Sequence, residues 1–205
     1  MNYLAHHDHL TGLANRTLLH ERLREAILYT QDCDHTVAVL LIDIDYIKKI
    51  NDSLGHAEGD ILLATLAQRL LSSVRESDTV ARIGGDEFVI VMPDFRTLYD
   101  VERCGHQIIC KAAQPIPTSG GEFSMTLSVD VSIYPEGGHS LEELLRHADA
   151  AMYAVKDTGR NSLCVYDKTT MSEREVLPRG HAPASEDRGG KDLLVLREHQ
   201  LSLMT

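Results

Sequence analysis

Cysteine is scarce in this sequence and shows no metal-binding or disulfide pattern. The four cysteines are scattered without paired spacing, which argues against a zinc site or a disulfide framework and predicts reduced thiols in a cytosolic protein. No apolar run approaches the roughly 20 residues that span a bilayer, and no signal peptide is visible. We therefore expect a soluble, cytoplasmic protein with no membrane segment in this chain.

Positive charge is also in short supply. The chain has 20 Lys and Arg against 31 Asp and Glu, giving a net charge of −11. Domains that bind nucleic acid usually carry a basic face, so we expect no nucleic-acid partner. A small polyanion that arrives with a divalent cation stays compatible with this charge, because the metal supplies the missing positive charge.

The hydrophobic pattern predicts alternating helices and strands. Hydrophobic residues make up 43% of the 205 residues, enough for one globular domain plus a tail. In chain order the pattern predicts a helix over 16–30, a strand over 36–45, helices over 46–55 and 59–75, strands over 78–83 and 87–92, a helix over 94–113, a strand over 125–134, a helix over 140–159 and a strand over 161–167. This order predicts an α/β (α+β) fold in which a mixed central β-sheet carries flanking helices, close to the split βαβ, ferredoxin-like arrangement.

The composition changes after residue 167. Prolines and glycines lie there among charged and small residues, and nothing ties the segment to the preceding domain. We therefore expect a domain over 1–167 and a flexible C-terminal tail or linker over 168–205.

Acidic residues stand where two predicted strands end. Asp43 and Asp45 close the first central strand, and Asp86 follows Gly84–Gly85 in the turn of a hairpin. If these strands are neighbours, Asp43 and Asp86 converge, and carboxylates with substrate phosphates are the ligands that Mg²⁺ uses. Glycine at the turn allows a triphosphate to approach the main chain. The alternative is a solvated turn with acids at strand ends, and spacing alone does not decide between the two.

Several motifs resemble one family in the same order. The run Gly84–Phe88 spells the motif that names the GGDEF family, the diguanylate cyclases. Residues 8–16 resemble the opening signature of that family, residues 42–60 its metal and guanine segment, and residues 147–161 its closing helix. The resemblance covers roughly the first four-fifths of the chain. It implies a nucleotide-cyclase palm-type core and a bacterial signalling enzyme that condenses two GTP into cyclic di-GMP with release of two pyrophosphates.

The resemblance also implies a role for individual residues near the metal. Asp43 and Asp86 would be side-chain metal ligands and the carbonyl of Ile44 a third oxygen ligand, for two Mg²⁺ per active site, with Mn²⁺ as a possible substitute. Such ions lower the pKa of the attacking 3′-hydroxyl and neutralise charge on the phosphates. Glu87 would assist the metal site or the proton transfer, and Lys48 would lie near the triphosphate.

The substrate-binding residues follow from the same resemblance. Besides Gly84 and Gly85, it implies that Lys156 and Arg160 lie near the triphosphate and that Asn51 and Asp60 read the guanine base. Each of the four also has a structural alternative when it is taken alone. Lys156 and Arg160 suit the C-terminal end of a helix dipole, Asn51 a helix C-cap, and Asp60 the acidic start of a helix.

Two further features concern assembly and regulation. The two identical linkages of the product require two GTP about a two-fold axis, so we expect catalysis by a homodimer of half-sites. Arg75 and Asp78 form an RxxD before the glycines, which in the family is the site of product inhibition by cyclic di-GMP. A helix end followed by a turn acid is the alternative. Arg103 is a weak candidate for the second inhibitory arginine.

One residue departs from the family pattern. Asp130 stands where the family usually has glycine, on the strand expected beside Asp43. Its carboxylate could lie near the metal site or pack elsewhere in the sheet, and it could repel GTP, add a metal ligand, or point to solvent. This departure keeps open a second hypothesis, a catalytically silent GGDEF module that binds GTP or cyclic di-GMP and regulates a partner.

Overall fold

The computed structural model describes residues 5–32, 36–155 and 160–167. In chain order the elements are α1 (Arg16–Asp32), β1 (Val37–Ile44), α2 (Ile47–Leu54), α3 (His56–Leu71), β2 (Thr79–Gly84), β3 (Glu87–Pro93), α4 (Leu98–Ala112), β4 (Ile116–Thr118), β5 (Gly121–Phe123), β6 (Leu127–Tyr134), α5 (Leu141–Val155) and β7 (Leu163–Val165). The predicted fold class is confirmed. The predicted tail over 168–205 lies outside the described residues and stays a prediction.

The helix boundaries differ from the expected ones for local reasons. The α3 helix begins earlier than predicted, at His56, because Gly55 has a φ of 89°, ends α2 and allows a new helix to start at the next residue. The α4 helix begins later than predicted, because Thr97 forms a capping box with Asp100. The short β4–β5 hairpin was not predicted.

The central sheet has the strand order β2-β3-β1-β6-β7. Strand β1 pairs antiparallel with β3 on one side and with β6 on the other, and its continuous apolar run is buried on both faces. The register sets Asp43, near the end of β1, opposite Glu87 on β3 and Ser128 on β6. The acidic end of β1 therefore lies between the hairpin turn that precedes β3 and the start of β6.

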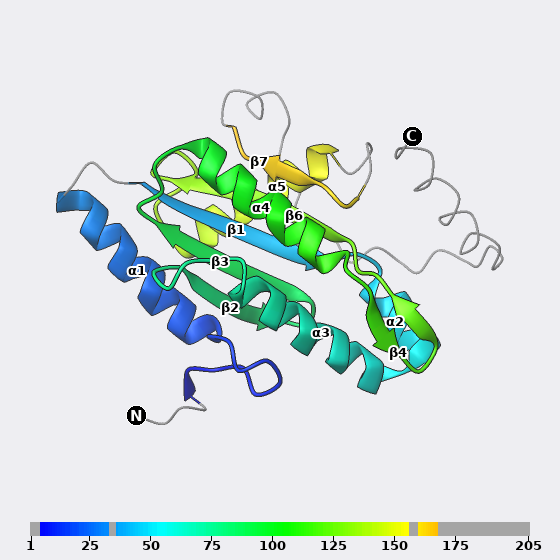
Figure 1. Cartoon of the computed structure of the whole chain (residues 1–205). Coiled ribbons are helices and arrows are strands. Elements are labelled where there is room, and N and C mark those ends of the chain that lie inside the picture. The colour runs from blue at the N-terminus through cyan, green and yellow to red at the C-terminus, as the bar shows by residue number, and fades with distance from the viewer. Residues whose placement is uncertain (1–4, 33–35, 156–159, 168–205) are drawn as a thin grey trace. The chain divides into compact units, whose positions relative to one another are not determined.

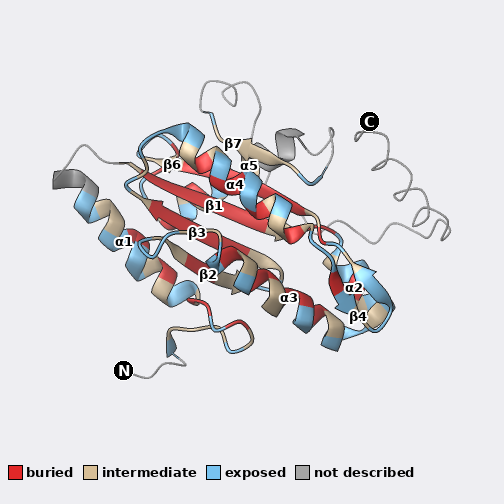
Figure 2. Ribbon diagram, viewed as in Figure 1, coloured by how far each residue is buried: buried red, intermediate tan, exposed pale blue. Residues whose placement is uncertain are grey.

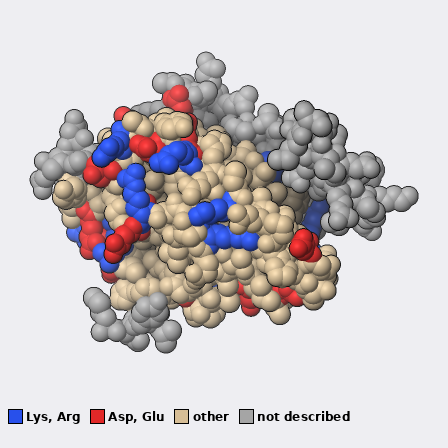
Figure 3. All heavy atoms as spheres, in the orientation of Figure 1, with Lys and Arg blue, Asp and Glu red and all other residues tan. Residues whose placement is uncertain are grey.

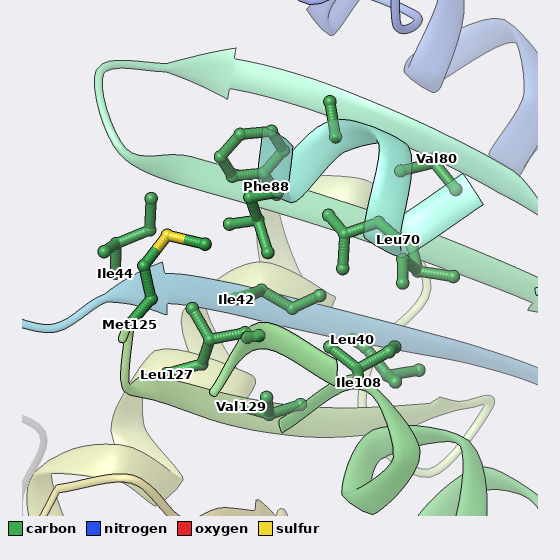
Figure 4. Close-up of a cluster of buried hydrophobic side chains, with 14 of the residues drawn as sticks. Leu40, Ile42, Ile44, Leu70, Val80, Phe88, Ile108, Met125, Leu127 and Val129 are labelled. Atoms are coloured by element: carbon green, nitrogen blue, oxygen red, sulfur yellow. The ribbon is translucent and has the colours of Figure 1, made fainter. Parts of the chain in front are cut away.

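Helices cover both faces of this sheet. In Figure 1, α3 and α4 lie in front of the sheet and α5 lies behind it. Figure 2 shows buried residues along the central strands and exposed residues on the outer sides of the helices. The front core packs side chains of alternating strand positions, among them Ile42, Phe88 and Val129, against α3 and α4 (Figure 4). The rear core packs Val39 and Val89, with their neighbours, against α1 and α5.

The segment ahead of α1 continues the sheet beyond β2. Ala14 forms a parallel bridge with Ala81, and its carbonyl accepts a hydrogen bond from the backbone N–H of Arg82 at 2.9 Å. The opening segment is therefore joined to the strand that leads into the glycine turn.

Charged side chains of both signs are interspersed on the surface. On the face that Figure 3 shows, basic side chains form separate groups, and acidic side chains lie beside several of them. Within the described ranges, no helix combines the length and hydrophobicity needed to cross a bilayer.

Candidate functional site

A cleft of about 290 Å³ lies at the acidic end of β1. It is lined by Asp43, Ile44, Asp45, Tyr46, Ile47, Lys48, Asp86, Ser128 and Arg160. The structure thus brings together five of the predicted site residues, namely Asp43, Ile44, Lys48, Asp86 and Arg160. They come from the end of β1, the start of α2, the glycine turn and the segment after α5. Glu87 pairs across from Asp43 in the β1–β3 ladder and is not among the lining residues of this described cleft.

The glycine turn is held by an arginine. Gly84 pairs with Glu87, and Gly85 has a φ of 44°, in the left-handed region that favours glycine. Arg82 donates from Nε and Nη2 to the carbonyl oxygen of Gly85, at 3.0 and 2.7 Å. A fixed cation therefore lies beside the turn that carries Asp86.

Arg82 is itself fixed by the opening segment. Its Nη1 lies 3.1 Å from Oδ1 of Asp8, and this carboxylate also accepts hydrogen bonds from the backbone N–H and the hydroxyl of Thr11. Burial alone would raise the pKa of Asp8, but the hydrogen bonds from Thr11 and the Arg82 guanidinium outweigh it, so the pKa lies below its ordinary value. The opening segment thus supports the glycine turn through the Asp8–Arg82 ion pair.

Asp45 has a structural position that the sequence did not reveal. Its carboxylate is buried, with Oδ1 accepting from the Ser128 hydroxyl at 2.9 Å and Oδ2 accepting from the backbone N–H of Asn161 at 3.1 Å. These two bonds tie β1 to β6 and to the segment after α5. The only signal in the sequence was an acid directly after the apolar run; Asp45 lies in the turn that follows β1.

Tyr46 and Arg160 meet at the rim of the cleft. Nη1 of Arg160 donates to the Tyr46 hydroxyl at 2.6 Å, and the guanidinium carbon lies 4.4 Å from the centre of the Tyr46 ring. The ammonium of Lys49 lies 4.9 Å from the same ring centre. The sequence had identified Arg160 but not its aromatic partner. Lys156, the other predicted phosphate ligand, lies outside the described residues.

The predicted guanine readers lie beyond the cleft, at the corner between α2 and α3. Asn51 lies one helical turn after Lys48 on α2, and its buried Oδ1 makes no hydrogen bond within the described residues. An added Cβ at Gly59 would lie 1.9 Å from that oxygen, so only glycine accommodates the amide there. The interpretation of Asn51 as a helix C-cap is wrong, because Gly55 caps α2 and donates to the Asn51 carbonyl.

Asp60, the other residue predicted to bind guanine, and Glu58 both lie on α3 at this corner. Asp60 is exposed on α3, whose first-turn acid is Glu58. Glu58 accepts a hydrogen bond from the backbone N–H of Ser119, in the loop of the β4–β5 hairpin, at 2.9 Å. Hydrogen bonds from Ser119 lower the pKa of Glu58. The unpredicted hairpin thus braces the corner that carries Asn51 and Asp60.

The RxxD residues lie between α3 and β2. The backbone N–H of Arg75 donates to Oδ2 of Asp78 at 2.8 Å, so Asp78 also closes the turn, as the alternative reading of the motif held. Burial raises the pKa of Asp78, although the N–H and the charge of Arg75 act against it. Arg75 lines a second hollow of about 380 Å³, together with Arg22 of α1. Arg103 lies 3.7 Å from Asp100, its neighbour on α4.

Asp130 is neither in the cleft nor in solvent. It pairs with Leu41 of β1 and Cys164 of β7 and is only 2% exposed, so the expectation that it could point to solvent is wrong. The residue opposite Asp43 is Ser128, and Asp130 lies two residues further along β6, about 7 Å away along the strand. Burial raises the pKa of the Cys164 thiol, and the Asp130 charge adds to that effect.

Comparisons with known proteins agree on one family. The family profile "Diguanylate cyclase, GGDEF domain" matches residues 5–162. The chain is 41% identical over 166 residues to the bifunctional diguanylate cyclase/cyclic di-GMP phosphodiesterase MucR of Pseudomonas aeruginosa, covering 81% of this chain and 24% of that protein. It is 42% identical over 159 residues to the diguanylate cyclase TpbB of the same species, covering 77% of this chain and 37% of TpbB. The chain thus spans 24% to 37% of the length of these relatives.

Solved structures give the same result. The isolated GGDEF domain of TpbB superposes with a TM-score of 0.75 at 40% identity, covering 79% of this chain and 95% of that domain. The coiled coil and GGDEF domain of DgcB from Caulobacter crescentus, solved in complex with c-di-GMP, superposes with a TM-score of 0.73 at 28% identity, covering 80% of this chain and 86% of that one.

Proposed function

Since the chain belongs to the GGDEF family of diguanylate cyclases, we propose that it condenses two GTP into cyclic di-GMP and two pyrophosphates. The observation that carries this proposal is the convergence of Asp43 and Asp86, from the end of one strand and the turn before another, in a single cleft. Residues as far apart as these meet there only because β1 and β3 are neighbours in the sheet.

The cleft suits a divalent cation held jointly with a substrate. Among the described residues, no three His, Cys, Asp or Glu side chains form a ready metal cage. Two carboxylates, with the Ile44 carbonyl as a third oxygen, match the way Mg²⁺ binds, because that ion usually takes one or two carboxylates plus substrate phosphates. When bound there, Mg²⁺ would lower the pKa of the 3′-hydroxyl and offset the phosphate charge. Asp43 and Asp86 would hold it.

The remaining lining residues supply positive charge and orientation. Lys48, on α2, and Arg160, after α5, both line the cleft and would bind the polyphosphate, with Lys156 as a further ligand. Gly84 and Gly85 have no Cβ to obstruct the phosphates, and open space surrounds both positions. Glu87 follows Asp86 on β3 and would assist the metal site or accept the proton of the hydroxyl.

Base selection belongs to the corner between α2 and α3. The Asn51 amide and the Asp60 carboxylate match the O6/N7 edge and the N1–H and amine edge of guanine, respectively. The contact to O6 and N7, which both accept, would come from the NH2 group of the Asn51 amide; the buried Oδ1, which makes no hydrogen bond within the described residues, can only accept and would need a donor. ATP presents the reverse pattern, so a site of this kind would reject it.

Catalysis would require two copies. One cleft serves one GTP, and the product has two equivalent linkages, so a homodimer would bring two half-sites face to face. We also propose that cyclic di-GMP inhibits through Arg75 and Asp78. The exposed Arg75 lines the hollow beside α1, where it could stack on a guanine or pair with a phosphate.

The test is product formation by the purified chain. Concentrated protein is incubated with GTP and Mg²⁺, and cyclic di-GMP is measured by chromatography and mass spectrometry, with Asp86→Asn as the inactive control. We expect the rate per subunit to rise with protein concentration. No product at any concentration from folded wild-type protein would refute the enzymatic proposal. Binding of GTP or cyclic di-GMP without turnover, even in an artificially dimerised version, would identify the silent module instead.

A further inference from the structure

Two consecutive residues fasten the segment that carries Arg160. Asp45 accepts a hydrogen bond from the backbone N–H of Asn161, and Tyr46 accepts one from the Arg160 side chain. Asp45 and Tyr46 directly follow β1, next to Asp43 and therefore next to the proposed metal site. Asp45 thus holds the backbone of this segment, and Tyr46, the next residue, holds the Arg160 guanidinium.

Tyr46 is unusual in its backbone and in its surroundings. Its φ of 61° is left-handed, a conformation that is rare for an aromatic residue and that indicates a local constraint. Its side chain lines the cleft although the residue is 49% exposed. Two cations, those of Lys49 and Arg160, lie within 5 Å of its ring. An aromatic ring attracts cations to its face, and the phenol oxygen adds a hydrogen bond to one of them.

Holding an arginine in advance favours binding of an anion. An exposed arginine samples many rotamers, and a ligand that fixes one of them loses free energy to that ordering. A guanidinium that already rests on a ring, with one N–H donated to the phenol, keeps its other donors directed away from that contact. The ligand then binds an arginine side chain that is already fixed, so less conformational entropy is lost on binding.

We propose that Tyr46 is a positioning residue that holds the Arg160 guanidinium over the cleft, where it meets the polyphosphate of the nucleotide. This inference rests on the proposed function, since it takes GTP as the ligand. It assigns Tyr46 no chemical step. It predicts that changes at Tyr46 act on phosphate binding, and only through Arg160.

The experiment measures binding of a nucleotide that cannot react. 3′-Deoxy-GTP lacks the attacking hydroxyl, so its affinity in the presence of Mg²⁺ is measured by calorimetry without turnover, and GMP is measured beside it. Tyr46→Phe removes the hydrogen bond and keeps the ring, whereas Tyr46→Leu removes both. The exposed tyrosine of α4 gives the matched control, Tyr99→Phe.

We expect Tyr46→Phe to weaken 3′-deoxy-GTP binding about 3- to 10-fold, a modest loss for a charged hydrogen bond because both partners are exposed. Tyr46→Leu should weaken it further, and Tyr99→Phe should have no effect. GMP lacks the β- and γ-phosphates, so its affinity should change less than about twofold in every variant. In an Arg160→Gln background, Tyr46→Phe should have no further effect.

The outcomes separate this inference from the proposed function. If wild-type protein binds 3′-deoxy-GTP and Tyr46→Phe changes nothing, or changes GMP binding equally, the positioning role is refuted and the proposed function stands. An equal loss in the Arg160→Gln background also refutes it, because Tyr46 would then act independently of the arginine. If wild-type protein binds neither nucleotide, the proposed function fails and this inference fails with it.

Discussion

Replacing Asp8 should reveal how strongly the opening segment supports the glycine turn. Asp8 accepts two hydrogen bonds from Thr11 and pairs with Arg82, whose side chain also holds the Gly85 carbonyl. The Asp8 and Arg82 side chains are only 16% and 12% exposed, so water screens this pair weakly. Breaking a fully buried pair costs about 3–5 kcal/mol. With the remaining exposure, we expect Asp8→Ala to lower the free energy of unfolding by about 2–3 kcal/mol.

The measurement is urea unfolding at pH 7, with thermal unfolding beside it. A loss of this size corresponds to a fall in Tm of about 5–10 °C for a domain of this length. Glu25→Gln is the matched control, because the Arg22–Glu25 pair has the same kind of charges but its side chains are 54% and 66% exposed. That control should change stability by less than about 0.5 kcal/mol.

The pH dependence of the free energy of unfolding tests the role of Asp8 a second time, because the direction of the change can be predicted. The pKa of folded Asp8 lies below the ordinary value of 3.8, so the folded state favours the ionised carboxylate. The stability from Asp8 is therefore fully present above the ordinary pKa and is lost as the pH falls through the folded pKa. The difference in the free energy of unfolding between wild type and Asp8→Ala should therefore narrow as the pH falls below 3.8. A variant no less stable than the Glu25→Gln control, or a difference that does not narrow in acid, would refute the reasoning.

Three further substitutions test other parts of the molecule. Gly59→Ala should raise the KM for GTP and weaken discrimination against ATP, because the new Cβ displaces the Asn51 amide. The measurement is steady-state kinetics with both nucleotides, and an unchanged ratio of kcat/KM for GTP to kcat/KM for ATP would contradict the prediction. Asp130→Ser should change Tm but leave the KM for GTP within about twofold, because Asp130 does not line the cleft; a larger shift in KM would show that its charge reaches the substrate. Asp78→Asn should keep the initial rate and relieve inhibition by added cyclic di-GMP, and inhibition equal to wild type would remove Asp78 from the inhibitory site.

The parts of the site that depend on local patterns could be predicted from the sequence. The apolar run of β1 identified a central strand, and the acids at its end and at the glycine turn were expected to converge if the two strands were neighbours. The family resemblance, not the spacing, favoured a metal site over a solvated turn. The register of the β1–β3 ladder does bring Asp43 to the level of Glu87. The order of elements followed from hydrophobic periodicity and turn residues alone.

The parts that depend on long-range contacts could not be predicted. Arg82 and Asp8 are 74 positions apart, and nothing in either segment indicates the other as its partner. The same holds for Tyr46 and Arg160, which are 114 positions apart. The β4–β5 hairpin has three residues in each strand, too few for an alternating pattern to emerge. Asp130 lies between Ser128 and Ser132 on the polar side of an alternating strand, and the alternation did not indicate that this side is buried.

The bridge between Ala14 and Ala81 has a consequence for how the domain tolerates shortening. A bare outer strand exposes unpaired amide and carbonyl groups, which can recruit the same strand of another molecule and start aggregation. Residues 5–15 shield part of β2 from such pairing, and the same stretch contains Asp8. A version that begins at α1 would therefore expose the edge of β2 to pairing with other molecules. It would also remove the Asp8 carboxylate that holds Arg82 beside the glycine turn.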